Sequence, residues 1–366
     1  MKPPTFAPIP ATLPATVPFV GPETLERQRG TPFSARIGAN ENGFGPSPAA
    51  IRAMRDSVPE IWKYGDPTSH DLIRALAAHL SVAPEQVTVG EGIDGLLGLL
   101  VRLMIAPGDA VVTSDGAYPT FNFHVTGFGG ALHKVPYRND AEDPAALTAR
   151  ARQVGARLVY LANPDNPMGS WHPGSTIRAM LDDLPDDCLL VLDQAYAEFA
   201  PPEALPQIAA DDPRVIRMHT FSKAYGMAGA RIGYAVGHSA LIAGFDRVRN
   251  HFGVNRVAQI GALAALADQG WLDQTRRQVA AARDRIADIA AANGMTALPS
   301  ATNFVAVDTG RDGAFARRLV AALAGHGVFV RMPGVAPQDR CIRISCAPAQ
   351  ELKILAGALP RALAGL

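Results

Sequence analysis

The chain is poor in cysteine, in net charge and in long hydrophobic runs. Three cysteines occur in 366 residues, Cys188, Cys341 and Cys346, and no two form a CxxC pair. A sparse, odd set of thiols is not a disulfide framework and is typical of a reducing compartment. Lys plus Arg and Asp plus Glu each number 34. This balance implies no polyanionic partner, so we expect neither nucleic acid nor a membrane surface to be bound.

No run of about 18 apolar residues free of charge occurs, so no transmembrane helix is predicted. Residues 1–22 are apolar but contain seven prolines, which would break the helix of a signal peptide. We expect an extended, proline-rich arm there, packed against the C-terminal third of the chain. The protein is predicted to be cytoplasmic and to carry no metal site.

Short apolar runs alternate with helical patterns through much of the chain. Strands are predicted at residues 86–89, 110–113, 157–162, 188–192 and 215–219. This alternation indicates an α/β fold, a mostly parallel sheet with helices on both faces. Alanine-rich helices and three short β segments follow residue 256, which indicates a smaller α+β domain. We therefore predict an arm over 1–44 belonging to the small domain, a large domain over 45–255 and a small C-terminal domain over 256–366.

Four polar clusters lie just past the C-terminal ends of predicted strands, where open α/β sheets bind ligands. The most informative is SKAYGMAGAR at residues 222–231, which follows the strand at 215–219. Lys223 offers an amine for an imine bond, while Ser222 and Arg231 offer a hydroxyl and a guanidinium for a phosphate. Pyridoxal phosphate needs these groups. Alone, the segment also fits a strand, a turn and a surface lysine.

Two further motifs agree with this interpretation. NPDNPMG at residues 163–169 is built from strong turn-forming residues. Asp193, in DQAY, follows a fully apolar strand and is either a cap or a functional carboxylate. With NENGFGPSP at residues 40–48 and CIRIS at 341–345, these motifs resemble the fold-type I pyridoxal-phosphate aminotransferases. Within them the chain is most similar to the histidinol-phosphate aminotransferase branch, over nearly its whole length.

The resemblance implies roles for the residues around the cofactor ring. Lys223 forms the resting imine with pyridoxal phosphate and, once released, moves the proton between Cα and the cofactor carbon. Asp193 faces the pyridine nitrogen and keeps it protonated. A charge pair at about 4 Å is worth roughly 4 kcal/mol at an effective dielectric of 20, or about three pKa units. Asn166 and Tyr196 are the donors to the ring hydroxyl oxygen, and Tyr118 stacks on the ring.

The resemblance also implies how the phosphate is held. Ser222 and Arg231 bind it together with the backbone N–H groups of Gly92, Ile93 and Asp94, because a helix N-terminus is a natural anion site. Tyr64 reaches the phosphate from a neighbouring subunit, which implies a homodimer. Without the resemblance, Tyr64 would be interpreted as an ordinary half-buried tyrosine and Tyr118 as a core aromatic.

The substrate end is implied by three further residues. Arg343 stands mid-strand among apolar residues, where an unpaired charge is costly, so we expect it to grip a substrate anion. Arg331 matches a second anion contact, and Asn303 a position near the substrate.

The sequence departs from the family at Phe19, where a tyrosine that helps hold the substrate phosphate is usual. Ile93, Gly95 and Cys346 also depart, which weakens the case for histidinol phosphate, whereas Gly43 does not affect it.

The predicted activity transfers an amino group from an amine or amino acid, with histidinol phosphate favoured, to a 2-oxo acid such as 2-oxoglutarate in two ping-pong half-reactions. An aromatic or other amino-acid aminotransferase, or a decarboxylase of a phosphorylated amino acid using the same cofactor, is the alternative. A non-catalytic ligand sensor fits less well, because no basic helix-turn-helix stretch is present. A nicotinamide-binding enzyme fits least, because the glycines at residues 90–92 lack the required spacing.

Overall fold

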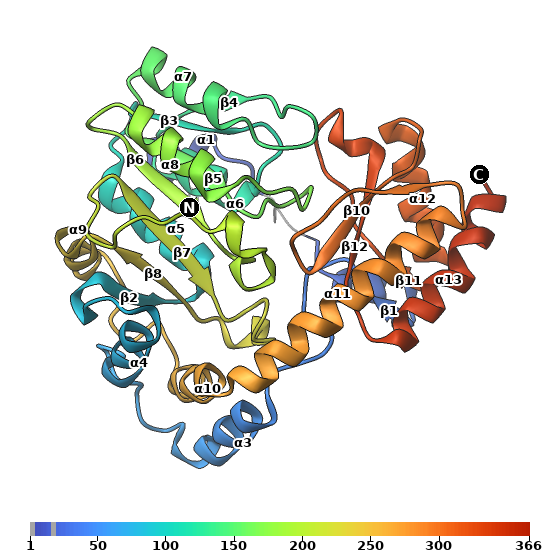
Figure 1. Cartoon of the computed structure of the whole chain (residues 1–366), viewed down its shortest axis with the longest axis horizontal. Coiled ribbons are helices and arrows are strands. Elements are labelled where there is room, and N and C mark those ends of the chain that lie inside the picture. The colour runs from blue at the N-terminus through green and yellow to red at the C-terminus, as the bar shows by residue number, and fades with distance from the viewer. Residues whose placement is uncertain (1–3, 16–19) are drawn as a thin grey trace.

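The computed structural model describes residues 4–15 and 20–366, which form one large and one smaller layered unit (Figure 1). The larger unit is built on a seven-stranded sheet. Its strands, in spatial order, are β2 (Val87–Gly90), β8 (Gly233–Gly237), β7 (Val215–Thr220), β6 (Leu189–Asp193), β5 (Leu158–Ala162), β3 (Ala110–Ser114) and β4 (Ala131–Val135). All neighbouring pairs are parallel except the two made by β8.

The central strands β5 and β6 bury both faces because their apolar residues run almost without interruption. Leu158 and Tyr160 of β5 pack with helices α5 (Gly92–Met104) and α6 (Pro119–Gly127). Val159 and Leu161 point the opposite way, toward α7 (Pro144–Val154) and α8 (Gly174–Asp183). Successive side chains of a strand alternate in direction, so one apolar strand serves two helix layers.

Other helices surround this sheet or lead away from it. They are α1 (Pro8–Thr12), α2 (Pro22–Arg29), α3 (Pro48–Ser57), α4 (His70–Leu80), α9 (Ser239–Gly244) and α10 (Arg256–Ala267). Among the described residues, no helix is both long enough and apolar enough to cross a membrane.

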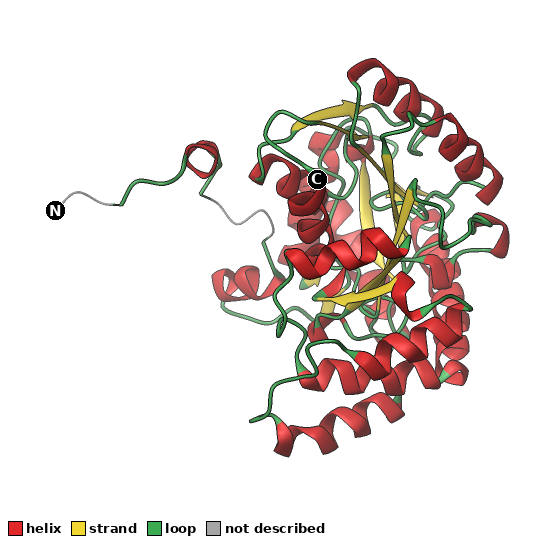
Figure 2. Ribbon diagram, turned by 90° about the vertical axis from the view of Figure 1, so that its left-hand side faces the viewer, coloured by secondary structure: helices red, strands yellow, loops and turns green. Residues whose placement is uncertain are grey.

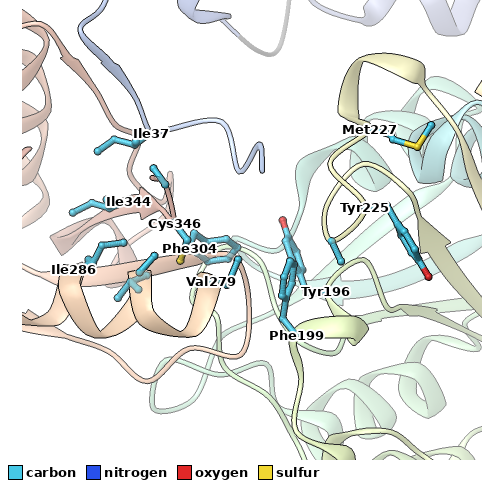
Figure 3. Close-up of a cluster of buried hydrophobic side chains, with 14 of the residues drawn as sticks. Ile37, Tyr196, Phe199, Tyr225, Met227, Val279, Ile286, Phe304, Ile344 and Cys346 are labelled. Atoms are coloured by element: carbon cyan, nitrogen blue, oxygen red, sulfur yellow. The ribbon is translucent and has the colours of Figure 1, made fainter. Parts of the chain in front are cut away.

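The smaller unit contains a three-stranded antiparallel sheet in the order β12 (Cys341–Ser345), β10 (Phe304–Asp308) and β9 (Thr296–Ala297). Beside it, β1 (Ala35–Arg36) pairs in parallel with β11 (Val328–Phe329). Its helices are α11 (Gln269–Ala291), α12 (Gly313–Gly325) and α13 (Ala349–Ala364). Figure 3 shows Val279 of α11 and Phe304 of β10 facing Tyr196 and Phe199, so apolar packing joins the two units beside the ends of the large sheet.

The predicted fold class is confirmed: the sheet is mostly parallel and helices cover both faces. The prediction missed β8 and β4, and it was wrong about a fully extended arm, since Pro8–Thr12 forms a short helix. Proline is tolerated in the first turn of a helix, where its missing N–H needs no partner.

The packing of the arm also differs from the prediction. Ala35 and Arg36 do pair with β11, but α1 lies outside the layers of the fold (Figure 2), and Ile9 lies against Gly129, just before β4. The arm therefore touches both units. The predicted domain boundaries stay a prediction.

Candidate active site

Two adjoining pockets open where the parallel strands β5, β6 and β7 end. The inner pocket is lined by Lys223, Asp193 and Arg231 among others, and the outer one by Arg331 and Arg343. Both share Asp94, Tyr118, Asn166 and Lys223. Because parallel strands present their C-terminal ends at one edge, residues distant in sequence meet there.

Lys223 stands three residues after the end of β7 and lines both pockets. The amine donates to the backbone oxygen of Asn40 at 3.2 Å and lies 5.8 Å from the centre of the Tyr196 ring. Burial, helped by the charge of Arg343, lowers the pKa of Lys223 to about 8. A substantial fraction of the amine is therefore neutral near physiological pH and able to act as a nucleophile or base.

Asp193 is the last residue of β6 and is only 5% exposed. Its Oδ2 accepts a hydrogen bond from the Tyr160 hydroxyl at 2.6 Å, and its Oδ1 accepts one from the Ala195 backbone N–H at 2.9 Å. Burial raises the pKa of Asp193 to about 6, against these two hydrogen bonds, which lower it. A buried carboxylate held in this way is suited to stabilise a cation in the inner pocket.

The predicted phosphate-binding residues converge at the start of α5. Arg231 Nη1 donates to Ser222 Oγ at 3.2 Å, and Arg231 Nη2 lies 3.7 Å from Asp94 Oδ2. Tyr118 donates to the other carboxylate oxygen of Asp94 at 2.8 Å. The Glu91 side chain makes no capping hydrogen bond to the first turn of α5, so backbone N–H groups at this helix end remain available to an anion.

Gly92 allows the guanidinium to lie against this helix end. Its φ is +79°, a conformation that favours glycine, and an added Cβ would lie 2.6 Å from Arg231 Nη2. The next residue, Ile93, lines the inner pocket. Ser222, Arg231 and the first residues of α5 (92–94) thus form the predicted phosphate-binding site, here called the anion cradle.

The substrate end contains Arg343 and Arg331. Arg343 donates to Asn166 Oδ1, while its Nε has no hydrogen-bond partner among the described residues. Burial, helped by the charge of Arg331, lowers the pKa of Arg343 to about 10. Arg331 Nη2 donates to the Val20 backbone oxygen at 2.9 Å. Two guanidiniums at the outer pocket fit an anionic ligand.

Three predicted residues are placed differently. Asn303 is fully buried and donates to the backbone oxygens of Asn40 and Glu41, so it braces the site rather than lining either pocket. Tyr64 is 78% exposed, lies 4.7 Å from the Phe252 ring centre and lines neither pocket within one chain. Phe19 lies outside the described residues.

Sequence reasoning missed Tyr160 and Asn40. Tyr160 lies within an apolar strand and reads as core, and only the parallel register of β5 with β6 brings it to Asp193. Asn40 was part of the quoted NENGFGPSP motif, but no role was attached to it. Its φ of +54° is a signal that sequence alone does not provide.

The fold and the site define an enzyme built around a lysine, a buried carboxylate and an anion-binding site, at the edge of an α/β sheet where the parallel strands end. The family model "Aminotransferase class I and II" matches residues 35–359. The chain belongs to this family.

Known proteins are similar to this chain over nearly its full length. A crystal structure titled as histidinol-phosphate aminotransferase from Sinorhizobium meliloti in complex with pyridoxal-5'-phosphate is 54% identical, with a TM-score of 0.96 and 98% of both chains covered. The histidinol-phosphate aminotransferase of Moorella thermoacetica is 34% identical over 346 residues, 93% of this chain and 89% of the relative. Histidinol-phosphate aminotransferase 2 of Pseudomonas aeruginosa is 35% identical over 353 residues, 95% of each.

Proposed function

We propose that this chain is a pyridoxal-phosphate-dependent aminotransferase that takes the amino group of histidinol phosphate and passes it to a 2-oxo acid such as 2-oxoglutarate. The observation that carries the proposal is the meeting of Lys223, Asp193 and the Ser222–Arg231 cradle in one pocket. The names of the relatives and the cofactor in the Sinorhizobium meliloti structure support it.

The residues of the inner pocket fit this cofactor. An anion cradle of a hydroxyl, a guanidinium and a helix N-terminus stands on one side, with Gly92 leaving room for Arg231. Asp193, a buried carboxylate, suits a protonated ring nitrogen, and Lys223 offers the amine. When bound, pyridoxal phosphate supplies an aldehyde that condenses with amines and a ring that accepts the electron pair released at the substrate carbon.

The roles of the chain's own residues follow from their positions. Lys223 Nζ, with its pKa lowered to about 8, is suited to take up a proton and return it at neutral pH. Asp193 would stabilise positive charge in the same pocket, and Tyr160 keeps that carboxylate oriented.

The substrate class is supported by the two arginines. Histidinol phosphate carries its amine on the carbon next to the one that bears the phosphate ester, and its imidazole lies at the other end of the molecule. Lys223 and Arg343 line the outer pocket together, and Arg331 lies there with them. A guanidinium with an unpartnered Nε suits a phosphate oxygen. A carboxylate would use the same groups, so an aromatic or other amino acid is the outcome that an activity test distinguishes.

We also propose a homodimer in which Tyr64 reaches the site of the second copy. Tyr64 and Trp62 are more than three-quarters exposed, and Phe252 beside Tyr64 is half exposed. Aromatic side chains in such a surface suit an interface between chains. The cytoplasmic location stays a prediction.

Trapping the cofactor tests the proposal directly. Borohydride reduction of the loaded protein, followed by peptide mapping, is expected to leave the cofactor mass on Lys223. Lys134, which also lines the outer pocket, is the internal control and should carry none. Lys223→Ala is expected to abolish both the label and turnover. Normal turnover in that variant would overturn the assignment.

A further inference from the structure

Asn40 connects three parts of the active site and has not been given a role. Its side-chain Nδ2 donates to the Tyr196 hydroxyl oxygen at 3.1 Å. Its backbone oxygen accepts from Lys223 Nζ at 3.2 Å and from Asn303 Nδ2 at 3.1 Å. Its backbone N–H donates to Ser345 Oγ at 2.9 Å. One residue therefore contacts the loop after β7, the loop after β6 and the end of β12.

The backbone conformation explains why an asparagine suits this position. Asn40 has a φ of +54° and is only 3% exposed. Asparagine and glycine enter this left-handed region more readily than other residues, but glycine has no side-chain amide. A buried asparagine here provides both the turn of the backbone and a hydrogen-bond donor aimed at Tyr196.

The contact with Tyr196 has a direction. The amide N–H of Asn40 can only donate, so the Tyr196 oxygen accepts and its own hydrogen remains free to point into the inner pocket. The Tyr196 ring is itself fixed, because it packs edge-on against Phe304 at 5.4 Å and 84° (Figure 3). Packing therefore fixes where the hydroxyl lies, and Asn40 fixes where its hydrogen points.

We propose that Asn40 is a positioning residue that directs the Tyr196 hydroxyl hydrogen toward the cofactor. The inference rests on the proposed function, in which Tyr196 donates to the ring oxygen of pyridoxal phosphate. A donor at that oxygen withdraws electron density from the ring and makes the cofactor-bound nitrogen less basic. Loss of the Asn40 amide weakens this effect by freeing the hydroxyl to turn away.

Charged groups around the pair set the background for such a measurement. Lys223 is faced by Arg343 and Arg231, which lower its pKa, and by Asp94 and Glu41, which raise it. Tyr196 is faced by Arg343 and by Asp193 and Asp165. Neutral substitutions at Asn40 and Tyr196 leave all of these charges in place.

The test is a double-mutant cycle on Asn40→Gly and Tyr196→Phe, with the pH midpoint of the bound cofactor's absorbance as the readout. Glycine keeps the positive φ and the backbone contact with Lys223 and removes only the side-chain amide. We expect Asn40→Gly to raise the midpoint by roughly half to one pH unit, about the effect of losing one hydrogen bond. Tyr196→Phe should raise it further, and the double variant should match Tyr196→Phe alone.

Two results would overturn the inference. An unchanged midpoint in Asn40→Gly means that the amide does not act on the cofactor. Shifts that add in the double variant mean that Asn40 acts independently of Tyr196. Thermal unfolding of the apoproteins identifies a variant that has merely lost its fold. A wild-type protein without a pH-dependent cofactor absorbance would instead contradict the proposed function, so the two failures are distinguishable.

Discussion

Arg331 and Arg343 face each other across an antiparallel bridge at the outer pocket. The Arg343 N–H donates to the Arg331 oxygen at 2.6 Å, and the Arg331 N–H donates to the Arg343 oxygen at 3.3 Å. Among the described residues, neither guanidinium has a carboxylate within ion-pairing distance. Two neighbouring cations without an anionic partner repel each other, which a bound anion would relieve.

Replacing Arg343 by alanine is therefore expected to lower kcat/KM for an anionic donor. The corresponding loss of transition-state stabilisation is about 2–5 kcal/mol, as for truncation of a buried charge pair. Arg343→Lys keeps the charge but loses the planar fork, so it should recover only part of the loss. Steady-state kinetics with histidinol phosphate and with histidinol, which lacks the phosphate, checks this. An equal loss for both donors would move the phosphate site elsewhere.

Gly92 offers a test of the anion cradle. An alanine at φ +79° costs about 1–2 kcal/mol in backbone strain, and its Cβ would also displace Arg231. We expect Gly92→Ala to weaken cofactor binding at least about tenfold, measured by titration into the apoprotein. Gly229→Ala, whose Cβ would meet nothing within 4 Å, is the matched control. Equal affinities for the two variants would contradict the cradle.

Asp193 and Tyr160 together predict a change in pH dependence. Asp193→Asn should lower kcat by about a thousandfold, because a charge interaction of about 4 kcal/mol is lost. Tyr160→Phe removes a donor that favours the ionised carboxylate, so the pKa of Asp193 should rise further above about 6. The acid limb of the kcat/KM profile should then move to higher pH by roughly one unit. An acid limb unchanged in Tyr160→Phe would contradict this.

Glu198, just after Tyr196, predicts a pH dependence of stability. Burial raises its pKa to about 7, and its Oε2 has no hydrogen-bond partner among the described residues. Because the folded-state pKa lies above the unfolded value, the favourable contribution is present below about pH 4 and is lost as pH rises through about 7. Glu198→Gln should therefore be more stable than wild type by up to about 3 kcal/mol at pH 8.

That gain should vanish near pH 4, and urea unfolding at the two pH values measures it. Glu203→Gln, an exposed glutamate in the following turn, is the matched control and should show no such difference. A Glu198→Gln variant with the same relative stability at both pH values would show that the carboxyl is not buried as described.

Local patterns predicted the strands that carry the site, and the reason is visible in β5 and β6. Both are fully buried, so their apolar runs are continuous and end at the polar residues Asn163 and Asp193. In contrast, β8 was missed because only three residues separate Gly233 from Gly237, so its apolar run is short.

The supporting contacts of the site could not be predicted, because they depend on tertiary register. Tyr160 reaches Asp193 only because residue 162 pairs with residue 193 across the parallel strands. Asn40 reaches Lys223 across 183 residues of sequence, through a segment held between β11 and β12. Neither contact can be predicted from the local sequence, whereas Lys223 and Asp193 lie in motifs whose residue types already indicate their chemistry.

The most direct test of the central claim is a single half-reaction. Cofactor-loaded protein is mixed with histidinol phosphate and no 2-oxo acid, while the absorbance of the bound cofactor is followed. We predict rapid loss of the resting absorbance at low donor concentration, and its return on addition of 2-oxoglutarate. Loss of absorbance only with phenylalanine, tyrosine or another amino acid, or release of CO2 without conversion of the cofactor, would contradict the account.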